Sequence, residues 1–216
     1  MKQRTSSKFG FHILVAAGVL AATAGAASAA TVTHFRLSDR SLIGNWEDAS
    51  DDFCFVSQTL VTFSESVTKI DGATIVGEPT TLVEVDYANA CTGEFLSLTG
   101  GTTNQTVTIG GDLSSASLSA VVTVTDGVNS ADVTINATWT ANGDLQIAKG
   151  HFKMTDGNTT TMDKFDEQVR PAATGGTIST VLPLAAGPTF VDLSRFPEGG
   201  TIGQNRLGDR TVTKKN

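Results

Sequence analysis

Two carboxylates with a spacing suited to acid–base chemistry occur at Glu84 and Asp86. On a β-strand, residues i and i+2 project from one face about 7 Å apart, and this separation suits two carboxyl groups acting on a glycosidic bond. Position 89, where a third acid would complete an E-x-D-x-x-E pattern, is Asn, which cannot ionise. The pair predicts a secreted carboxylate-dependent hydrolase, glycosidase-like, as one alternative. Like charges that face water on one sheet are the competing interpretation.

Other catalytic sets are poorly represented. After residue 29 the chain has two histidines, His34 and His151, and no G-x-S-x-G sequence, so a serine triad is not indicated. The string from Ser66 to Lys69 matches S-x-x-K, but the S-D-N and K-T-G partners of that nucleophile are missing. We therefore expect a non-catalytic protein with a role in binding, adhesion or envelope structure.

An acidic segment supplies the best metal-ligand candidates. Glu47, Asp48, Asp51 and Asp52 place four carboxylates within a short stretch, and calcium prefers several oxygen ligands. The spacing does not match an EF-hand loop, so a solvated acidic loop is the competing interpretation. We expect no cofactor, and a calcium-stabilised binding module is the second alternative.

Two aromatic residues are candidates for ligand binding. Trp46 lies beside the acidic segment, and with Tyr87 it would form a small rim. The ligand of such a rim would be a carbohydrate or another envelope or extracellular protein. An isolated Trp in a small β domain also commonly packs in the core.

The two cysteines, Cys54 and Cys91, predict a structural disulfide. A redox pair prefers C-x-x-C and a metal site needs more Cys or His nearby, and neither context exists. The chain-entropy model gives such a bridge about 4 kcal/mol of stabilisation. Disulfides persist in oxidising compartments, which agrees with export from the cytoplasm.

The first 29 residues predict a cleaved signal peptide. Lys2, Arg4 and Lys8 precede an apolar run that ends in Ala27-Ser28-Ala29, the basic, apolar and small-residue layout of a secretory signal. The run is too short and too interrupted for a membrane anchor, which needs roughly 20 apolar residues. We expect cleavage near Ala29/Ala30, a secreted or periplasmic destination and no membrane span in the mature chain.

The charge of the mature chain argues against nucleic acid as a partner. Three of the 15 basic residues and none of the 22 acidic ones precede residue 30, which leaves a net charge of −10. An acidic surface repels phosphate backbones, and the sequence shows no basic patch.

Alternating apolar and polar residues predict an all-β fold. Within 113–155, alternating stretches are separated by Asp126-Gly127 and Asn142-Gly143, the strongest local hairpin signals. We expect a three-stranded antiparallel meander there with Trp139 on its buried face. Many short strands with Gly-rich turns indicate an antiparallel β-sandwich or an open barrel.

The predicted organisation is a single domain over 30–194 followed by a tail. Thr161–Val169 is the only segment with a helical pattern. Residues 195–216 are rich in Gly and charge and show weak strand patterning, so we expect a loosely ordered basic tail.

Overall fold

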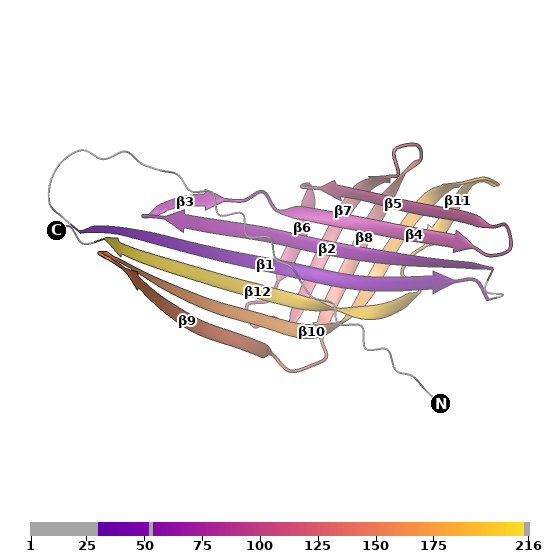
Figure 1. Cartoon of the computed structure of the whole chain (residues 1–216). Helices are drawn as coiled ribbons and strands as arrows, with labels where there is room; N and C mark the ends of the chain where they lie inside the picture. Colours follow the sequence, from indigo (N-terminus) through magenta and orange to yellow (C-terminus); the bar gives the residue numbers. More distant parts are fainter. Residues whose placement is uncertain (1–29, 52–53, 214–216) are drawn as a thin grey trace, which may run out of the picture.

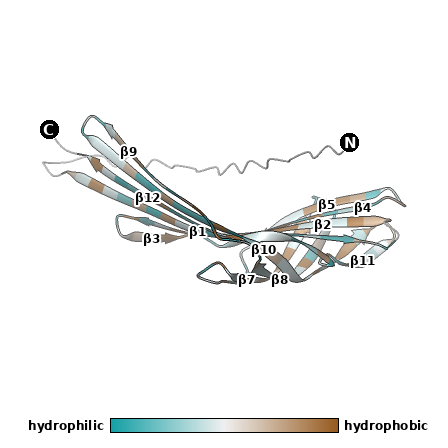
Figure 2. Ribbon diagram, turned by 90° about the horizontal axis from the view of Figure 1, so that it is seen from below, coloured by the Kyte–Doolittle hydropathy of each residue, from teal (hydrophilic) through white to brown (hydrophobic). Residues whose placement is uncertain are grey.

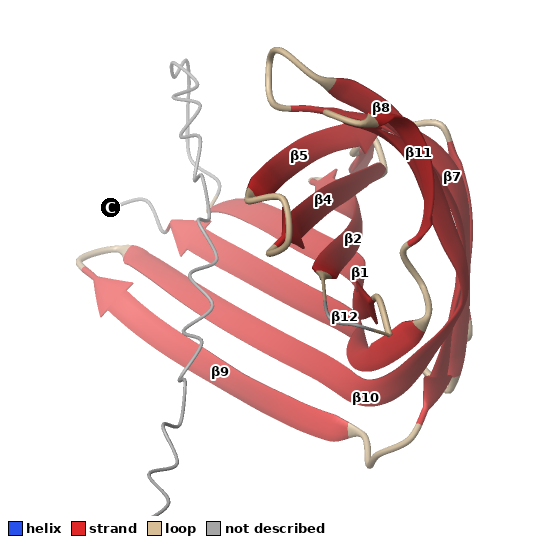
Figure 3. Cartoon of the chain, turned by 90° about the vertical axis from the view of Figure 1, so that its right-hand side faces the viewer, coloured by secondary structure: helices blue, strands red, loops and turns tan. Residues whose placement is uncertain are grey.

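A computed structural model describes residues 30–51 and 54–213 (Figure 1). The predicted signal peptide, residues 1–29, lies outside these ranges. The described residues form strands β1 (Thr31–Ala49), β2 (Phe55–Ile70), β3 (Ala73–Val76), β4 (Thr80–Asn89), β5 (Glu94–Thr102), β6 (Gln105–Ile109), β7 (Ser115–Thr125), β8 (Ser130–Ala141), β9 (Gln146–Asp156), β10 (Thr159–Leu184), β11 (Gly187–Asp192) and β12 (Phe196–Thr213). These residues contain no helix, and all their strand pairings are antiparallel (Figure 3). The all-β, antiparallel prediction is confirmed.

The main strand pairings form a closed circuit. They follow the order β1, β12, β10, β8, β7, β5, β4 and β2, and β2 pairs again with β1. The link between β5 and β7 is short, at Thr99–Thr125 and Gly100–Val124. Apolar residues alternate with exposed Ser and Thr along β7 and β8, so one side of each strand faces the core. Burial of that side supplies the hydrophobic stabilisation.

Trp139 lies on the buried face of β8, as predicted. Its side chain is 1% exposed, and its Nε1 donates a hydrogen bond to the carbonyl oxygen of Ile43 at 2.7 Å. The indole of Trp46 meets it edge-on, with ring centroids 5.8 Å apart. The hydrogen bond satisfies the buried indole N–H and joins β8 to β1 across the core.

The predicted meander is correct for two of its strands. β7 and β8 pair across the Asp126-Gly127 turn, with Ser115 opposite Thr140 at the far end. β9, the predicted third strand, pairs with β10 instead. The edge of β8 that does not pair with β7 pairs with residues 172–180 of β10. Both sides of β9 are exposed, so it has no apolar side to add to the core.

The disulfide between Cys54 and Cys91 is confirmed, with the two Cα atoms 5.2 Å apart. Cys54 precedes β2 and Cys91 follows β4, and these strands pair from Phe55–Asn89 onwards. The bridge therefore continues the β2–β4 ladder by a covalent bond where the hydrogen-bonded pairing stops.

Part of the sheet projects beyond the core as a single layer. We call it the sheet extension; it comprises residues 31–41 of β1, 64–70 of β2, 159–169 of β10 and 203–213 of β12, with β3 and β9 at its edges. Figure 2 shows it leading away from the part of the molecule that holds β4, β5, β7, β8 and β11. We call that part the body.

Two sequence predictions are corrected in the extension. Thr161–Val169, predicted as helical, belongs to β10, because β9 and β12 supply hydrogen-bonded pairing on both of its sides. Residues 195–216, predicted as a loose tail, contain the long strand β12, which pairs with β1 and β10. Glycines weaken its local strand signal, but Gly200 is needed there, because a Cβ would collide with the carbonyl oxygen of Ile43.

We expect Trp139→Ala to lower the free energy of unfolding by about 3–5 kcal/mol, because it leaves a large cavity and removes the hydrogen bond to the Ile43 carbonyl. Chemical denaturation followed by fluorescence and circular dichroism measures this change. Thr138→Ala on the exposed side of β8 is the matched control, and it should cost no more than about 0.5 kcal/mol. A loss below about 1 kcal/mol for Trp139→Ala would contradict the core position.

Candidate functional site

Glu84 and Asp86 lie on the outer side of β4, between the buried residues Val83, Val85 and Tyr87. Glu84 is exposed and Asp86 is half-buried. A shallow pocket of about 460 Å³ is lined by Glu84 but not by Asp86, and its other residues are Leu60, Thr62, Leu82, Val83, Thr99 and Gly100. The two carboxylates share a face, as predicted, but no common pocket encloses them.

Trp46 and Tyr87 are core residues rather than a surface rim. Trp46 is 0% exposed and Tyr87 is 4% exposed. The Tyr87 ring stacks on Phe55 with centroids 5.8 Å apart, and Asn89 Nδ2 donates a hydrogen bond to its hydroxyl. Because both rings are covered by the protein itself, neither is available to a ligand.

Glu47 and Asp48 of the acidic segment project from opposite sides of β1, because successive residues of a strand alternate in direction. Glu47 accepts a hydrogen bond from Gln58 on the outer side, whereas Asp48 is buried. Arg195 approaches the segment from the loop before β12 and pairs with Asp51 at 2.9 Å. Asp52 lies outside the described residues. Among the described residues no group of three or more His, Cys, Asp or Glu is arranged to hold a metal.

Burial raises the pKa of Asp48 above its ordinary value, with a smaller contribution from the charge of Asp192. The backbone hydrogen bond from Ala49 and the charge of Arg195 oppose this shift. Arg195 Nη1 also donates to the Ala49 carbonyl at 3.1 Å. The Arg195 guanidinium therefore lies beside Asp48 and Asp51, two of the four candidate calcium ligands.

We expect Glu84→Gln and Asp86→Asn to leave the free energy of unfolding within about 0.5 kcal/mol of wild type, because both carboxylates lie on an outer face. The same variants test hydrolysis. Turnover of soluble β-glucans, xylan or chitin oligosaccharides by wild type, lost in either variant, would contradict a non-catalytic protein.

The sheet extension has two faces that can be assigned from the strand register. Residues opposite each other on antiparallel strands project from the same face, and successive residues project from opposite faces. Across the extension, one register row contains Lys69, Arg36, Gly208, Lys164 and His151. The next row, with Leu37, Leu207 and Phe165, projects from the other face.

One face, which we call the basic face, collects the cationic side chains. It carries eight Lys and Arg residues, all exposed: Arg36, Arg40, Lys69, Lys149, Lys153, Lys164, Arg206 and Arg210. His34 and His151 share it, and its acids are Glu65 and Asp166. These eight are all of the Lys and Arg residues in the described extension.

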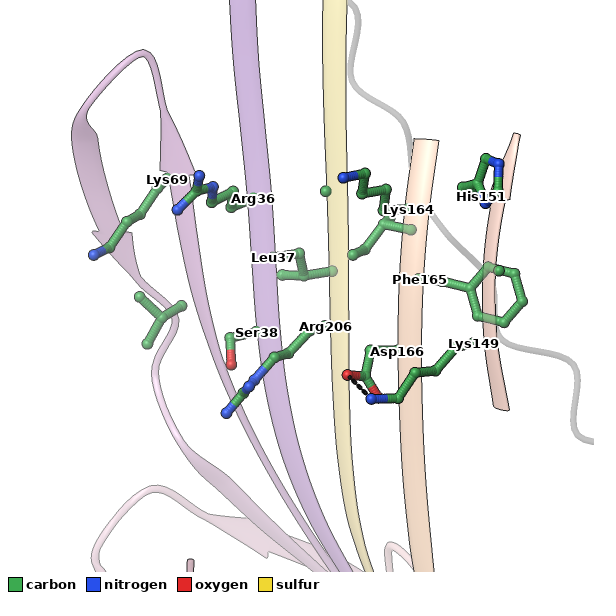
Figure 4. A pocket seen from close by; sticks show the side chains of 14 residues that line it. Arg36, Leu37, Ser38, Lys69, Lys149, His151, Lys164, Phe165, Asp166 and Arg206 are labelled. Carbon is green, nitrogen blue, oxygen red and sulfur yellow. Dashed lines mark ion pairs between the residues drawn. The ribbon is translucent and has the colours of Figure 1, made fainter. Parts of the chain in front are cut away.

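A hollow of about 640 Å³ lies on the extension among these residues. Figure 4 shows Lys69, Arg36, Lys164 and His151 at one level across the strands, and Arg206, Asp166 and Lys149 at the next. Lys149 pairs with Asp166 at 3.1 Å, and Arg40 pairs with Glu65. The other six cations make no ion pair with any described residue.

The opposite face, which we call the acidic–apolar face, carries no Lys, Arg or His in the described extension. Its charged residues are Asp39, Asp156, Asp163, Glu167 and Asp209. Between them lie Phe35, Leu37 and Leu207, which are half-buried, and Ile70, Ile75, Phe152, Met154 and Phe165, which are exposed. The single-layer sheet therefore separates opposite charges on its two sides.

The acids of this face lack cations among the described residues. Asp163 lies opposite Asp209; burial raises the pKa of Asp163, and the charge and hydrogen bonding of Asp209 raise it further. Burial also raises the pKa of Asp39, whose Oδ1 has no hydrogen-bond partner among the described residues. Ionised Asp39 and Asp163 are thus held in an unfavourable setting.

Neither charged face of the extension is predicted from the sequence. Each strand mixes the charges along the chain, as in Asp163-Lys164-Phe165-Asp166, so overall composition shows only acidity. The available signal is that the cations of a strand occupy positions of one parity, as Arg206 and Arg210 do in β12. It becomes informative once Thr161–Val169 is a strand rather than a helix, and once β12 is a strand rather than a tail.

Asp163→Asn should become more stabilising, relative to wild type, as pH rises from about 4 to 7. A raised carboxyl pKa in the folded state means that wild type loses stability as pH increases through that pKa, and Asn cannot ionise. Because Asp163 is only half-buried and solvent screens its charge, the gain at neutral pH should stay below about 1 kcal/mol. Denaturant unfolding at several pH values measures it, and a gain that shrinks towards neutral pH would contradict the proposed repulsion.

The described part of the chain contains no helix long and apolar enough to cross a membrane. No family model and no curated protein matches the sequence. A crystal structure from Nitrosomonas europaea, provisionally described as AttH, is similar with a TM-score of 0.27 and 11% identity, covering 84% of this chain and 52% of that one. This chain spans about half the length of that structure, and a likeness at this score supports no argument about function.

Proposed function

We propose that this chain is an exported, non-catalytic binding protein that holds anionic groups of a partner on the basic face of its sheet extension. The carrying observation is that all Lys and Arg residues of the described extension project from one face. Eight of the twelve Lys and Arg residues that follow residue 29 lie on this single face, although the chain from residue 30 has a net charge of −10. A face of this kind attracts anions locally, whatever the net charge of the molecule.

Several observations favour binding over catalysis. Glu84 and Asp86 line no common pocket, and the acidic segment is engaged by Arg195. The disulfide agrees with folding in an oxidising compartment, as the predicted signal peptide requires. The basic face has no Phe, Tyr or Trp on which bases could stack, so an anionic carbohydrate or protein suits it better than a single-stranded nucleic acid.

We expect the oxidised chain from residue 30 to be retained on a sulfonate cation exchanger at low salt, despite its net negative charge. Arg36→Gln with Lys164→Gln should elute at clearly lower salt, because it removes two cations from the centre of the face. Salt releases such contacts as the Debye length falls from about 10 Å at 0.1 M to about 3 Å at 1 M.

A charge-matched control separates local from net charge. Ser117→Glu with Val128→Glu changes the net charge by the same amount, and both positions are exposed on the body. This control should elute close to wild type. Equal loss of retention in the two double variants, or no retention of wild type, would count against the proposed function.

A further inference from the structure

We infer that the partner held by the basic face is the acidic–apolar face of a second copy of this chain, so that sheet extensions stack on one another. The inference rests on the proposed function, because it names the anionic partner of the same basic face. It also assigns a role to the opposite face, which an unrelated anionic partner would leave uncovered.

The first argument is charge complementarity between the two faces. The basic face has eight Lys and Arg residues against two acids, and the acidic–apolar face has five acids and no base. Six of the cations make no ion pair with a described residue. Stacking would bring unpaired cations to the opposed carboxylates of Asp163 and Asp209 and to Asp39, which has an unpartnered Oδ1.

The second argument is the uncovered apolar surface. Five large apolar side chains are exposed on the acidic–apolar face, with Phe152 61% and Phe165 45% exposed. A β-sheet is normally covered by a second layer on its apolar side, and such patches mark interaction surfaces. In a stack the methylene stems of Lys and Arg can lie over these rings while their charged ends reach the carboxylates.

The dimensions of the extension suit a stable contact. Four strands of 11 residues (β1, β9, β10 and β12), with 7 residues of β2 and the 4 of β3, form the extension. At about 3.3 Å per residue and about 4.8 Å between strands they give a face of roughly 850–900 Å². Burial of such a face gives about 800–900 Å² per copy, the size of a standard specific interface. Stacked sheets lie about 10 Å apart, within the reach of Lys and Arg side chains.

The contact must join unlike faces. Two acidic–apolar faces would oppose five carboxylates to five, and two basic faces would repel equally. Unlike-face contact is heterologous, so each added copy leaves one free face of each kind. The association therefore continues beyond a dimer, and it weakens as salt rises because its charges are exposed.

Sedimentation velocity on the oxidised chain from residue 30 tests the inference. At about 0.1 M salt the weight-average mass should rise with concentration beyond that of a dimer, and about 1 M salt should shift the curve to at least tenfold higher concentration. The basic-face variant is Arg36→Glu with Lys164→Glu, and the acidic-face variant is Asp163→Lys with Glu167→Lys. Each alone should stay monomeric at concentrations where wild type associates, because the net charge of the altered face falls from +6 to +2 in the first variant and from −5 to −1 in the second.

A mixture of the two variants provides the decisive measurement. The basic-face variant retains an intact acidic–apolar face, and the acidic-face variant retains an intact basic face, so an equimolar mixture should regain association. Ser117→Glu with Val128→Glu should associate like wild type. Circular dichroism establishes that each variant is folded. If a charge reversal prevents folding, the neutral pair Arg36→Gln with Lys164→Gln replaces it and should weaken association at least tenfold.

The outcomes separate the two proposals. Wild type that binds the cation exchanger through the basic face but stays monomeric at all concentrations overturns the stacking inference alone and assigns the face to a different anionic partner. Failure of exchanger binding removes the proposed function itself. Self-association that persists in either variant alone, or a mixture that stays monomeric, also overturns stacking through these faces.

Discussion

The alternation of side chains along β1, β10 and β12 controls both parts of the molecule. These strands run without interruption from the body into the sheet extension, and their pairing fixes which residues share a face. On one side of these strands the alternation places Leu42 and Ile202 in the core. The same side of the sheet carries Arg36 and Arg206 a few residues further along, in the extension. Because the side-chain period of a strand is two, a register slip by one residue would exchange every core residue for a solvent-facing one.

The junction between the body and the extension is packed around two indoles. Trp46 and Trp139 meet edge-on, and the hydrogen bond from Trp139 to Ile43 joins β8 to β1. Gly44 and Gly200 lie against these rings, where a Cβ would collide with an indole or with backbone. The glycines that reduce strand propensity in β1 and β12 are therefore what lets the strands pass close to the core at this point.

The body and the extension differ in how their strands are covered. The body buries its apolar side within the closed circuit of strands and is covalently fastened by the Cys54–Cys91 bridge. The extension has no such interior, and its strands keep polar and charged residues on both sides. Under the proposed function, this single layer is the surface that contacts the partner.

The sequence by itself determined the all-β class, the disulfide, the β7–β8 hairpin and the burial of Trp139, because each depends on local alternation, turn residues or a unique cysteine pair. Only the tertiary structure decided the pairing of β9, the strand state of Thr161–Val169 and the incorporation of β12, since their hydrogen-bond partners lie far away in the chain. The two charged faces belong to the same group. Cations and acids are interspersed along the strands, and composition shows only the excess of acids, so only the lateral register of five strands collects the cations of the extension on one side.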